Sequence, residues 1–253
     1  MRKRFNKEKC IELLKNHSKK EVAEILEIPY QNLIQSLYYH KIKTVKNYYV
    51  NHEYFKTESH SMYYILGFIT ADGNIHNKRH YLAIELQLGD EEVLKFILEE
   101  ISPKQNILYY THKDKRNNKE HKSCKIAIYS KTIKEDLINI GIVPNKTKEG
   151  IFIDVEKIPE EYFYDFIRGL IDGDGSILKH ENGIYTKITC SDKNFLIKIQ
   201  KRINLPSSIQ HDRNHSNLIY CHNSSKILHE KIYKDYKKSF TLERKREKSY
   251  ACI

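Results

Sequence analysis

The sequence lacks the long apolar run that a membrane-spanning helix requires, since no stretch approaches about 18 consecutive apolar residues. Its basic start is not followed by the apolar core of a secretory signal either. We therefore expect no membrane association and a cytoplasmic location, with import into an organelle left open.

Cysteine and histidine patterns typical of metal sites are also missing. The five cysteines are widely spaced and form no CxxC pair, which argues against a structural zinc site or a disulfide framework. The thirteen histidines show no ligand spacing. Any metal chemistry in this chain is therefore expected to depend on oxygen ligands.

What the sequence does have is positive charge. Its formal net charge is +11 and its pI is about 9.2. A surplus of this size favours a polyanionic partner such as nucleic acid, although a merely lysine-rich composition would give the same number.

Residues 1–47 are predicted to be helical, and residues 48–60 to be a linker. Apolar residues are spaced like the core of a helix-turn-helix, with Pro29 able to open the second helix. Glu27 stands where such a turn usually has glycine. A plain helical hairpin remains the alternative. The core positions are Val22, Ala23, Leu26, Ile28, Leu33 and Leu37.

The most informative feature is an internal repeat. "YYILGFITADGNI" (63–75) returns about a hundred residues later as "DFIRGLIDGDGSI" (165–177). After each copy a strand leads into a helix, with Asp90 or Asp192 as the expected N-cap. Residues 61–150 and 151–253 each read as helix, two strands, helix, two strands, helix.

The two repeated helices carry small residues at every fourth position, followed by an acid. The small residues are Gly67, Ala71, Gly169 and Gly173. Small residues four apart share one face and allow another backbone to approach closely, so the two helices are predicted to pack together. Asp72 and Asp174 would then meet at the same end of the pair.

Two carboxylates at helix C-termini are unfavourable, because they repel each other and the negative end of each helix dipole. Divalent cations would relieve both effects. Hard oxygen ligands favour Mg²⁺ over zinc, and paired carboxylates holding Mg²⁺ suit phosphodiester hydrolysis.

"ILGFITADG" and "IRGLIDGDG" resemble the two motif copies of the LAGLIDADG homing endonucleases, in their single-chain, two-motif form. The resemblance implies an α+β fold of two pseudo-symmetric αββαββα halves. Saddle-shaped antiparallel sheets would flank a central helix pair, with the N-terminal helical unit as an addition. Thr70 replaces the first acid of the first motif, whereas the family's metal ligand is the second acid, which both copies keep.

The resemblance also implies functional residues. Asp72 and Asp174 would be catalytic metal ligands, aided by the carbonyls of Ala71 and Gly173. Lys131 and Lys226 match a lysine at the strand-to-helix step near the scissile phosphates. Gln87 fits a polar catalytic residue at the end of the second strand. Its counterpart is Thr189, and Glu85 and Lys187 are lesser choices for the same position.

DNA would lie across the exposed strand faces and the adjoining loops. The charged segment 111–123 and its equivalent in the second half, residues 210–217, are expected to contact phosphates. The residues expected to contact DNA are Tyr81, Glu85, Gln87, Lys125, Tyr185, Lys187, Thr189 and Arg213.

We therefore predict a Mg²⁺-dependent, site-specific DNA endonuclease of the intron-homing type, making a staggered double-strand cut in double-stranded DNA. Because both motifs lie in one chain, we expect a monomer. Two alternatives remain: an intron maturase that binds its host intron RNA, and a non-catalytic DNA-binding regulator with the same fold.

Overall fold

The computed structural model describes residues 6–17, 19–42, 49–113, 120–181 and 183–250. The chain divides into two compact units, residues 1–48 and 49–253, and each has a hydrophobic core of its own. None of the helices in these described ranges is long and apolar enough to cross a membrane.

The described part of the first unit contains three helices. They are α1 (Lys7–Asn16), α2 (Lys19–Ile25) and α3 (Tyr30–Tyr39). Their apolar faces meet in a small core formed by Cys10, Val22, Ala23, Leu33 and Leu37. The apolar spacing read from the sequence thus corresponds to burial.

The second unit contains the repeat. Its first half consists of α4 (His60–Asp72), β1 (Gly73–Ile75), β2 (Tyr81–Gln87), α5 (Glu91–Ile101), β3 (Leu108–Lys113), β4 (Glu120–Tyr129) and α6 (Lys131–Ile140). Its second half consists of α8 (Glu160–Asp172), β5 (Gly175–His180), β6 (Gly183–Cys190), α9 (Lys193–Ile203), β7 (Ser208–Asp212), β8 (His215–Tyr220) and α10 (His222–Tyr233). A short helix follows each half, α7 (Lys146–Glu149) or α11 (Glu243–Tyr250).

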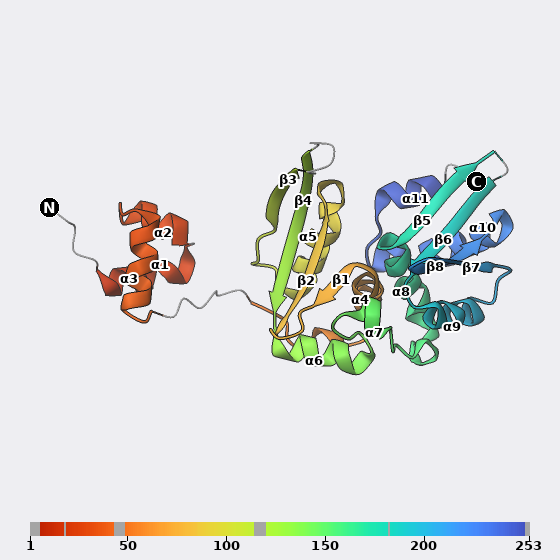
Figure 1. The fold of residues 1–253 in the computed structure, drawn as a ribbon, viewed down its shortest axis with the longest axis horizontal. Coiled ribbons are helices and arrows are strands. Elements are labelled where there is room, and N and C mark those ends of the chain that lie inside the picture. The colour runs from red at the N-terminus through yellow and green to blue at the C-terminus, as the bar shows by residue number, and fades with distance from the viewer. Residues whose placement is uncertain (1–5, 18, 43–48, 114–119, 182, 251–253) are drawn as a thin grey trace. The chain divides into compact units, whose positions relative to one another are not determined.

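Each half forms one four-stranded antiparallel sheet, with strand orders β1-β2-β4-β3 and β5-β6-β8-β7. The identical order confirms the predicted αββαββα repeat. Apolar and polar residues alternate along the strands, so one face of each sheet is buried. On this face, Ile84 pairs with Ile126 in the first sheet, and Ile188 pairs with Leu218 in the second. Figure 1 shows α4 and α8 side by side, with one sheet on either side of them.

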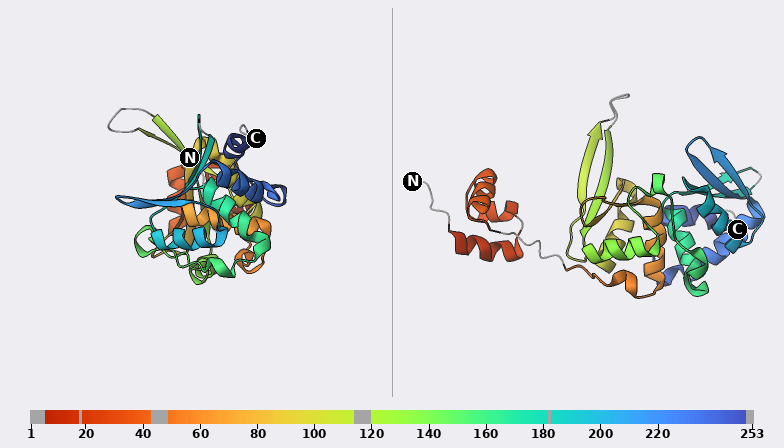
Figure 2. Two further views of the ribbon diagram at one scale, coloured as in Figure 1. Left: turned by 90° about the vertical axis from the view of Figure 1, so that its right-hand side faces the viewer. Right: turned by 60° about the horizontal axis from the view of Figure 1, so that its bottom comes forward.

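The β3–β4 hairpin extends past the end of β2, because Gln87, the last residue of β2, pairs with Ser123, three residues after β4 begins. Figure 2 shows this hairpin standing clear of the sheet. The expected phosphate-binding segment 111–123 therefore consists partly of strand, and its residues 114–119 lie outside the described residues.

Residues 49–60, expected to be linker, instead belong to the second unit. A short 3₁₀ helix, Tyr54–Lys56, buries Tyr54 and Phe55 in the main core. The backbone N–H of Asn51 donates to the carbonyl of Ile101 at 2.8 Å. Two aromatic side chains in a short polar stretch supply enough apolar area to fix it in place.

Candidate active site

The centre of the second unit is the contact between α4 and α8. A methyl group added to Gly67 would overlap the carbonyl oxygen of Phe166, and one added to Gly169 would overlap that of Tyr64. Backbone therefore touches backbone at both glycines, as the sequence spacing predicted. The close approach fixes where the two helix ends lie.

Those ends bring the two motif acids together. Asp72 is the last residue of α4, and Asp174 follows the C-cap Gly173 of α8. A side chain on Gly173 would overlap the Cβ of Ala71 and lie 3.3 Å from Oδ2 of Asp72. Because Gly173 has no side chain, the Asp72 carboxylate fits against it. Gly173 directly precedes Asp174 in the chain, so the two acids lie close together.

The electrostatics show that the two carboxylates share one environment. Burial and, to a smaller extent, the charge of Asp174 together raise the pKa of Asp72 to about 6. Asp174 reaches solvent, yet the surrounding protein still desolvates its carboxylate and raises its pKa. Lys146 and Lys245 oppose these shifts at both acids. The site therefore contains two carboxylates with raised pKa values and two lysine ammonium groups.

Lys245 caps the C-terminal end of α8. Its buried ammonium group donates to the carbonyls of Ile171 at 2.6 Å, Asp172 at 2.7 Å, Gly173 at 3.1 Å and Gly175 at 2.9 Å. The carbonyls of Ile171, Asp172 and Gly173 are among those that the end of a helix leaves without partners, and the cation complements the helix dipole; Gly175 is the first residue of β5. Burial lowers the pKa of Lys245 to about 8.

The segment before α11 places Lys245 by contacts with α8. The Arg168 side chain donates to the carbonyl of Phe240 at 2.8 Å and to Oγ of Ser239 at 2.9 Å. The backbone N–H of Leu242 donates to Asp172 at 2.9 Å. Buried polar residues of the second motif helix thus position the chain that carries the lysine.

Lys146 occupies the corresponding place in the first half, at the start of α7. Its ammonium group donates to the carbonyl of Gly73 at 2.5 Å, immediately after Asp72. Burial lowers its pKa, while Asp174 and Asp72 act in the opposite direction. The two lysines therefore follow the pseudo-symmetry of the repeat, although neither belongs to the motif.

The lysines expected from the sequence lie elsewhere. Lys131 begins α6, is exposed and pairs with Glu135 at 3.4 Å. The preceding residue, Ser130, donates its backbone N–H to the carbonyl of His80, at the β1–β2 connection. Residue 81 begins β2, whereas Gly73, next to the acid, pairs with Ile84 further along that strand. The structure therefore does not bring Lys131 to the acid pair.

Lys226 lies in α10, half-buried, one turn after His222. The ring of His222 accepts the backbone N–H of Ile184 at 3.1 Å, which places this end of α10 beside the β5–β6 connection. Neither Lys131 nor Lys226 is among the charges that shift the pKa of Asp72 or Asp174. A lysine following the third helix of each half was the signal that sequence reasoning missed.

Gln87 is linked to the site through Asp90, whose charge acts on Asp72. Its amide donates to Asp90 at 3.0 Å, and Asp90 also accepts from Arg244 at 2.6 and 2.7 Å. The sequence predicted that Asp90 caps α5. Its carboxylate instead binds the side chains of Gln87 and Arg244 and makes no capping hydrogen bond. Asp192 does cap α9, by accepting two backbone N–H groups. Thr189, the counterpart of Gln87, instead donates to Asn217 at 2.9 Å.

The donor set fits a hard divalent cation. Asp72 and Asp174 supply carboxylate oxygens whose repulsion a cation would relieve, and Mg²⁺ commonly binds through one or two carboxylates with water completing its shell. The carbonyl of Gly173, an expected ligand, accepts from Lys245. Ala71 lines an open hollow with Asp72 and Lys146. No cluster of three His, Cys, Asp or Glu side chains able to hold a metal occurs among the described residues.

The side chains expected to contact DNA all reach solvent. Glu85 lies opposite Lys125 on the face of the first sheet turned away from the core, and the pair forms an ion pair of 3.0 Å. Tyr185 and Lys187 alternate with buried Ile184 and Ile188 in β6. Arg213 is exposed in the β7–β8 turn. Both sheets therefore present a polar face.

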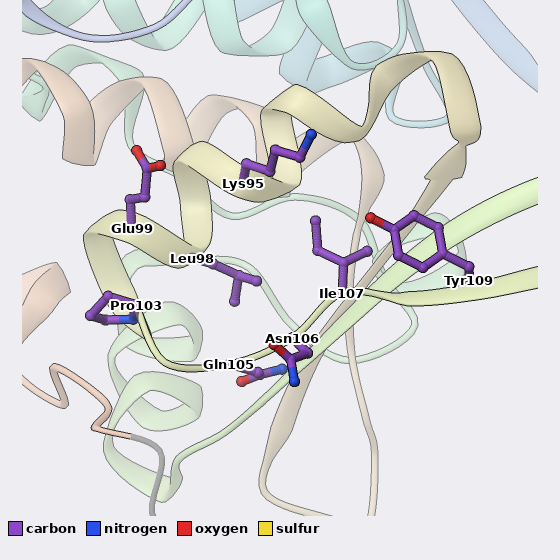
Figure 3. A pocket seen from close by; sticks show the side chains of 8 residues that line it. All are labelled: Lys95, Leu98, Glu99, Pro103, Gln105, Asn106, Ile107 and Tyr109. Atoms are coloured by element: carbon purple, nitrogen blue, oxygen red, sulfur yellow. The ribbon is translucent and has the colours of Figure 1, made fainter.

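A second hollow lies between α5 and β3 (Figure 3). Lys95 and Tyr109 line it from opposite walls, and Lys95 pairs with Glu91 at 2.5 Å. None of its lining residues borders the acid pair. It supplies no pair of carboxylates and is separate from the acid pair of Asp72 and Asp174.

Comparison with known proteins agrees with this geometry. Residues 164–240 match the family model of the LAGLIDADG-like domain. No curated protein sequence matches the chain. The homing endonuclease I-WcaI bound to its DNA recognition sequence is 14% identical, with a TM-score of 0.58, covering 83% of this chain and 96% of that one. This likeness shows the fold.

Structures of DUF199/WhiA are also similar. Its N-terminal LAGLIDADG domain is 19% identical, with a TM-score of 0.48, covering 74% of this chain and 85% of that one. The full-length protein from Thermatoga maritima is 18% identical, with a TM-score of 0.49, covering 79% of this chain and 63% of that one. The predicted LAGLIDADG resemblance is confirmed at the level of a domain match and a shared fold.

Proposed function

We propose that this chain, which contains a LAGLIDADG-like domain within a fold shared with homing endonucleases, is a site-specific DNA endonuclease that makes a Mg²⁺-dependent, staggered double-strand cut. The observation that carries the proposal is the meeting of Asp72 and Asp174 at the end of the glycine-packed helix pair. One acid from each half suits a reaction that must cut two strands.

A bound divalent cation supplies Lewis-acid polarisation of a phosphodiester, and Asp72 and Asp174 are the residues that would hold it. Lys146 and Lys245 are the cations beside the two acids, and Lys245, with its pKa lowered to about 8, is mostly protonated at neutral pH. Their ammonium groups stabilise negative charge as it develops on the phosphate oxygens. The buried hydrogen bonds of Lys245 keep its group in place before substrate arrives.

The sheet faces supply DNA affinity in this proposal. They present amide, hydroxyl, phenol and ammonium groups, which can bind base edges in the major groove and phosphates beside it. The net charge of +11 adds non-specific attraction to the duplex. Binding should therefore weaken steeply as salt rises.

A non-catalytic DNA-binding regulator is the second candidate. The separate three-helix unit favours it, because such a unit adds DNA contact without adding chemistry. Both carboxylates and both nearby lysines are nevertheless present. DNA binding alone does not require two desolvated carboxylates at the junction of the halves, so their presence favours the endonuclease.

The experiment begins with selection of duplexes from a randomised library in Ca²⁺, which supports binding but is expected not to support cutting. The selected site is then placed in a supercoiled plasmid and incubated with the protein in Mg²⁺, Ca²⁺ or EDTA. The endonuclease proposal predicts a linear product in Mg²⁺ alone. Tight binding with no cutting in Mg²⁺ would favour the regulator.

A further inference from the structure

The first unit has the geometry of a helix-turn-helix. Glu27, between α2 and α3, adopts a left-handed backbone with φ of 52°. The N–H of Glu27 donates to the carbonyl of Glu24 at 2.9 Å, and that of Ile28 donates to the carbonyl of Ala23 at 3.0 Å. This is the paired hydrogen-bond pattern that ends a helix sharply. The turn forms although its left-handed residue is glutamate rather than glycine.

Helix α3 buries one face and exposes the other. Leu33 and Leu37 lie in the core of the unit. At about 100° per residue, the exposed residues of α3 other than Tyr30, its first residue, fall within a sector of about 120° on the opposite side. The exposed residues in this sector, here called the α3 face, are Gln31, Asn32, Gln35, Tyr38 and Tyr39. Tyr38 and Tyr39 are 88% and 81% exposed.

The chemistry of the α3 face suits nucleic acid better than a protein surface. It offers amide and phenol groups and no aliphatic side chain. Residues 30–39 contain no Asp or Glu, and the first 48 residues hold eleven Lys and Arg against five Glu, a surplus of six positive charges. The charge of this unit is thus complementary to phosphate, and its uncharged helix can approach a base pair without repulsion.

We propose that α3 is a second DNA-reading element, which enters the major groove of duplex DNA beside the site bound by the sheets. The major groove admits an α-helix, and Asn and Gln side chains pair in a bidentate manner with adenine N6 and N7. In a helix-turn-helix, the second helix reads the bases and the first crosses the backbone. The DNA target is therefore expected to contain two segments of specified base pairs. The long block is read by the sheets, and the separate short block is read by Gln31, Asn32 and Gln35.

The test compares three full-length proteins: the parent, the double variant Gln31→Ala/Gln35→Ala, and a control, Ile11→Ala, at an exposed position of α1. Alanine favours helix at exposed positions, so the double variant is expected to retain α3. Each protein selects duplexes from the same randomised library in Ca²⁺. Circular dichroism and thermal unfolding of all three proteins check that they are folded.

The expected result is that the parent and Ile11→Ala select both blocks, whereas the double variant loses the short block and keeps the long one. On the parental site, the double variant should bind about tenfold more weakly or worse, because each lost bidentate contact is worth about 1–3 kcal/mol. On a site with the short block scrambled, parent and variant should bind equally. Identical consensus sequences for the parent and a folded double variant would overturn the proposal.

This inference goes beyond the endonuclease proposal, and the same experiment separates their failures. A parent that selects only the short block refutes DNA binding by the sheets while supporting the role of α3. A parent that selects only the long block, in agreement with the double variant, refutes the role of α3 and leaves the nuclease untouched. Failure of the parent to select any duplex overturns both.

Discussion

At the scale of single residues, the four lysines of interest differ in what surrounds them. Lys245 is buried and donates to four backbone carbonyls, and the half-buried Lys146 donates to the carbonyl of Gly73 next to Asp72, whereas Lys131 is exposed and paired with Glu135. A charge acts on a reacting phosphate when it lies close by in a water-poor site. We therefore expect Lys146→Met to slow single-turnover cleavage by about 10²-fold.

The matched variants are Lys131→Met and Lys226→Met, which should slow the same reaction by less than about tenfold, since their charge does not reach the acids. Lys245→Met should resemble Lys146→Met in rate and also lower the unfolding temperature, because four carbonyls lose their donor. Equal slowing by Lys131→Met and Lys146→Met would restore the assignment made from sequence.

His229 provides a pH-dependent test of packing. It is buried, its Nε2 lies 2.7 Å from Oγ1 of Thr186, and burial lowers its pKa to about 4. The unfolded chain takes up a proton near pH 6.5, before the folded chain does, so stability falls as pH drops from about 6.5 to about 4. This group accounts for up to about 3 kcal/mol of that loss.

Urea unfolding of the parent and of His229→Gln across this pH range measures the effect. The variant lacks the titrating ring, so its unfolding free energy should fall less steeply between pH 6.5 and 4. Parallel curves for the two proteins would show that the ring titrates normally in the folded state.

At the scale of elements, the α4–α8 contact permits a direct test. A methyl group at Gly67 or Gly169 meets backbone of the partner helix, which cannot rotate away, whereas Gly89 has open space around it. Gly67→Ala and Gly169→Ala should each lower the free energy of unfolding by about 1–3 kcal/mol or more, because overpacking forces the helices apart. Gly89→Ala is the control and should change it by less than about 0.5 kcal/mol.

Urea denaturation of the three glycine variants provides the comparison. The two helix variants should also lose cleavage activity, because separation of the helices moves Asp72 from Asp174. Wild-type stability in Gly67→Ala would mean that the backbones are further apart than the structure places them.

The repeated elements were predictable from sequence because their signals are local. The spacing of Gly67 and Ala71, matched by Gly169 and Gly173, predicted the helix pair, and alternation in each strand predicted the buried sheet faces. Matching of the two copies then placed Asp72 beside Asp174. Each of these inferences needs only residues within one turn or one strand, together with the repeat.

The lysines of the site could not be predicted in this way, because tertiary packing decides which of many lysines lies near the acids. Lys245 is brought in by a segment anchored to Arg168, about seventy positions away in the chain. Lys131 stands at the strand-to-helix step after β4, the position expected from the sequence. The register of β2 and β4 nevertheless places it at the end of the sheet that is far from the acid pair. Contacts of this range leave no periodic signal.

At the scale of the whole molecule, the two halves share one hydrophobic core. Residues of α4, α8 and both sheets belong to a single buried cluster. The helix pair that would join two subunits in a dimer is therefore already closed within one chain. We expect sedimentation velocity at micromolar concentration to give a single species near 30.2 kDa, the mass of one chain. A dimer that persists on dilution would contradict this closure.

The central claim is that DNA is cut at the pair formed by Asp72 and Asp174. The most direct measurement compares Asp72→Asn, Asp174→Asn and the surface control Asp154→Asn for cleavage of plasmid carrying the selected site in Mg²⁺, beside gel-shift binding in Ca²⁺. An amide keeps the shape of the carboxylate and loses the charge that holds the cation. We predict that each of the two pair variants loses about 10³-fold or more of the double-strand cleavage rate while binding within about threefold of the parent, and that Asp154→Asn matches the parent. Linearisation of the plasmid at the parental rate by either Asp72→Asn or Asp174→Asn would contradict the account.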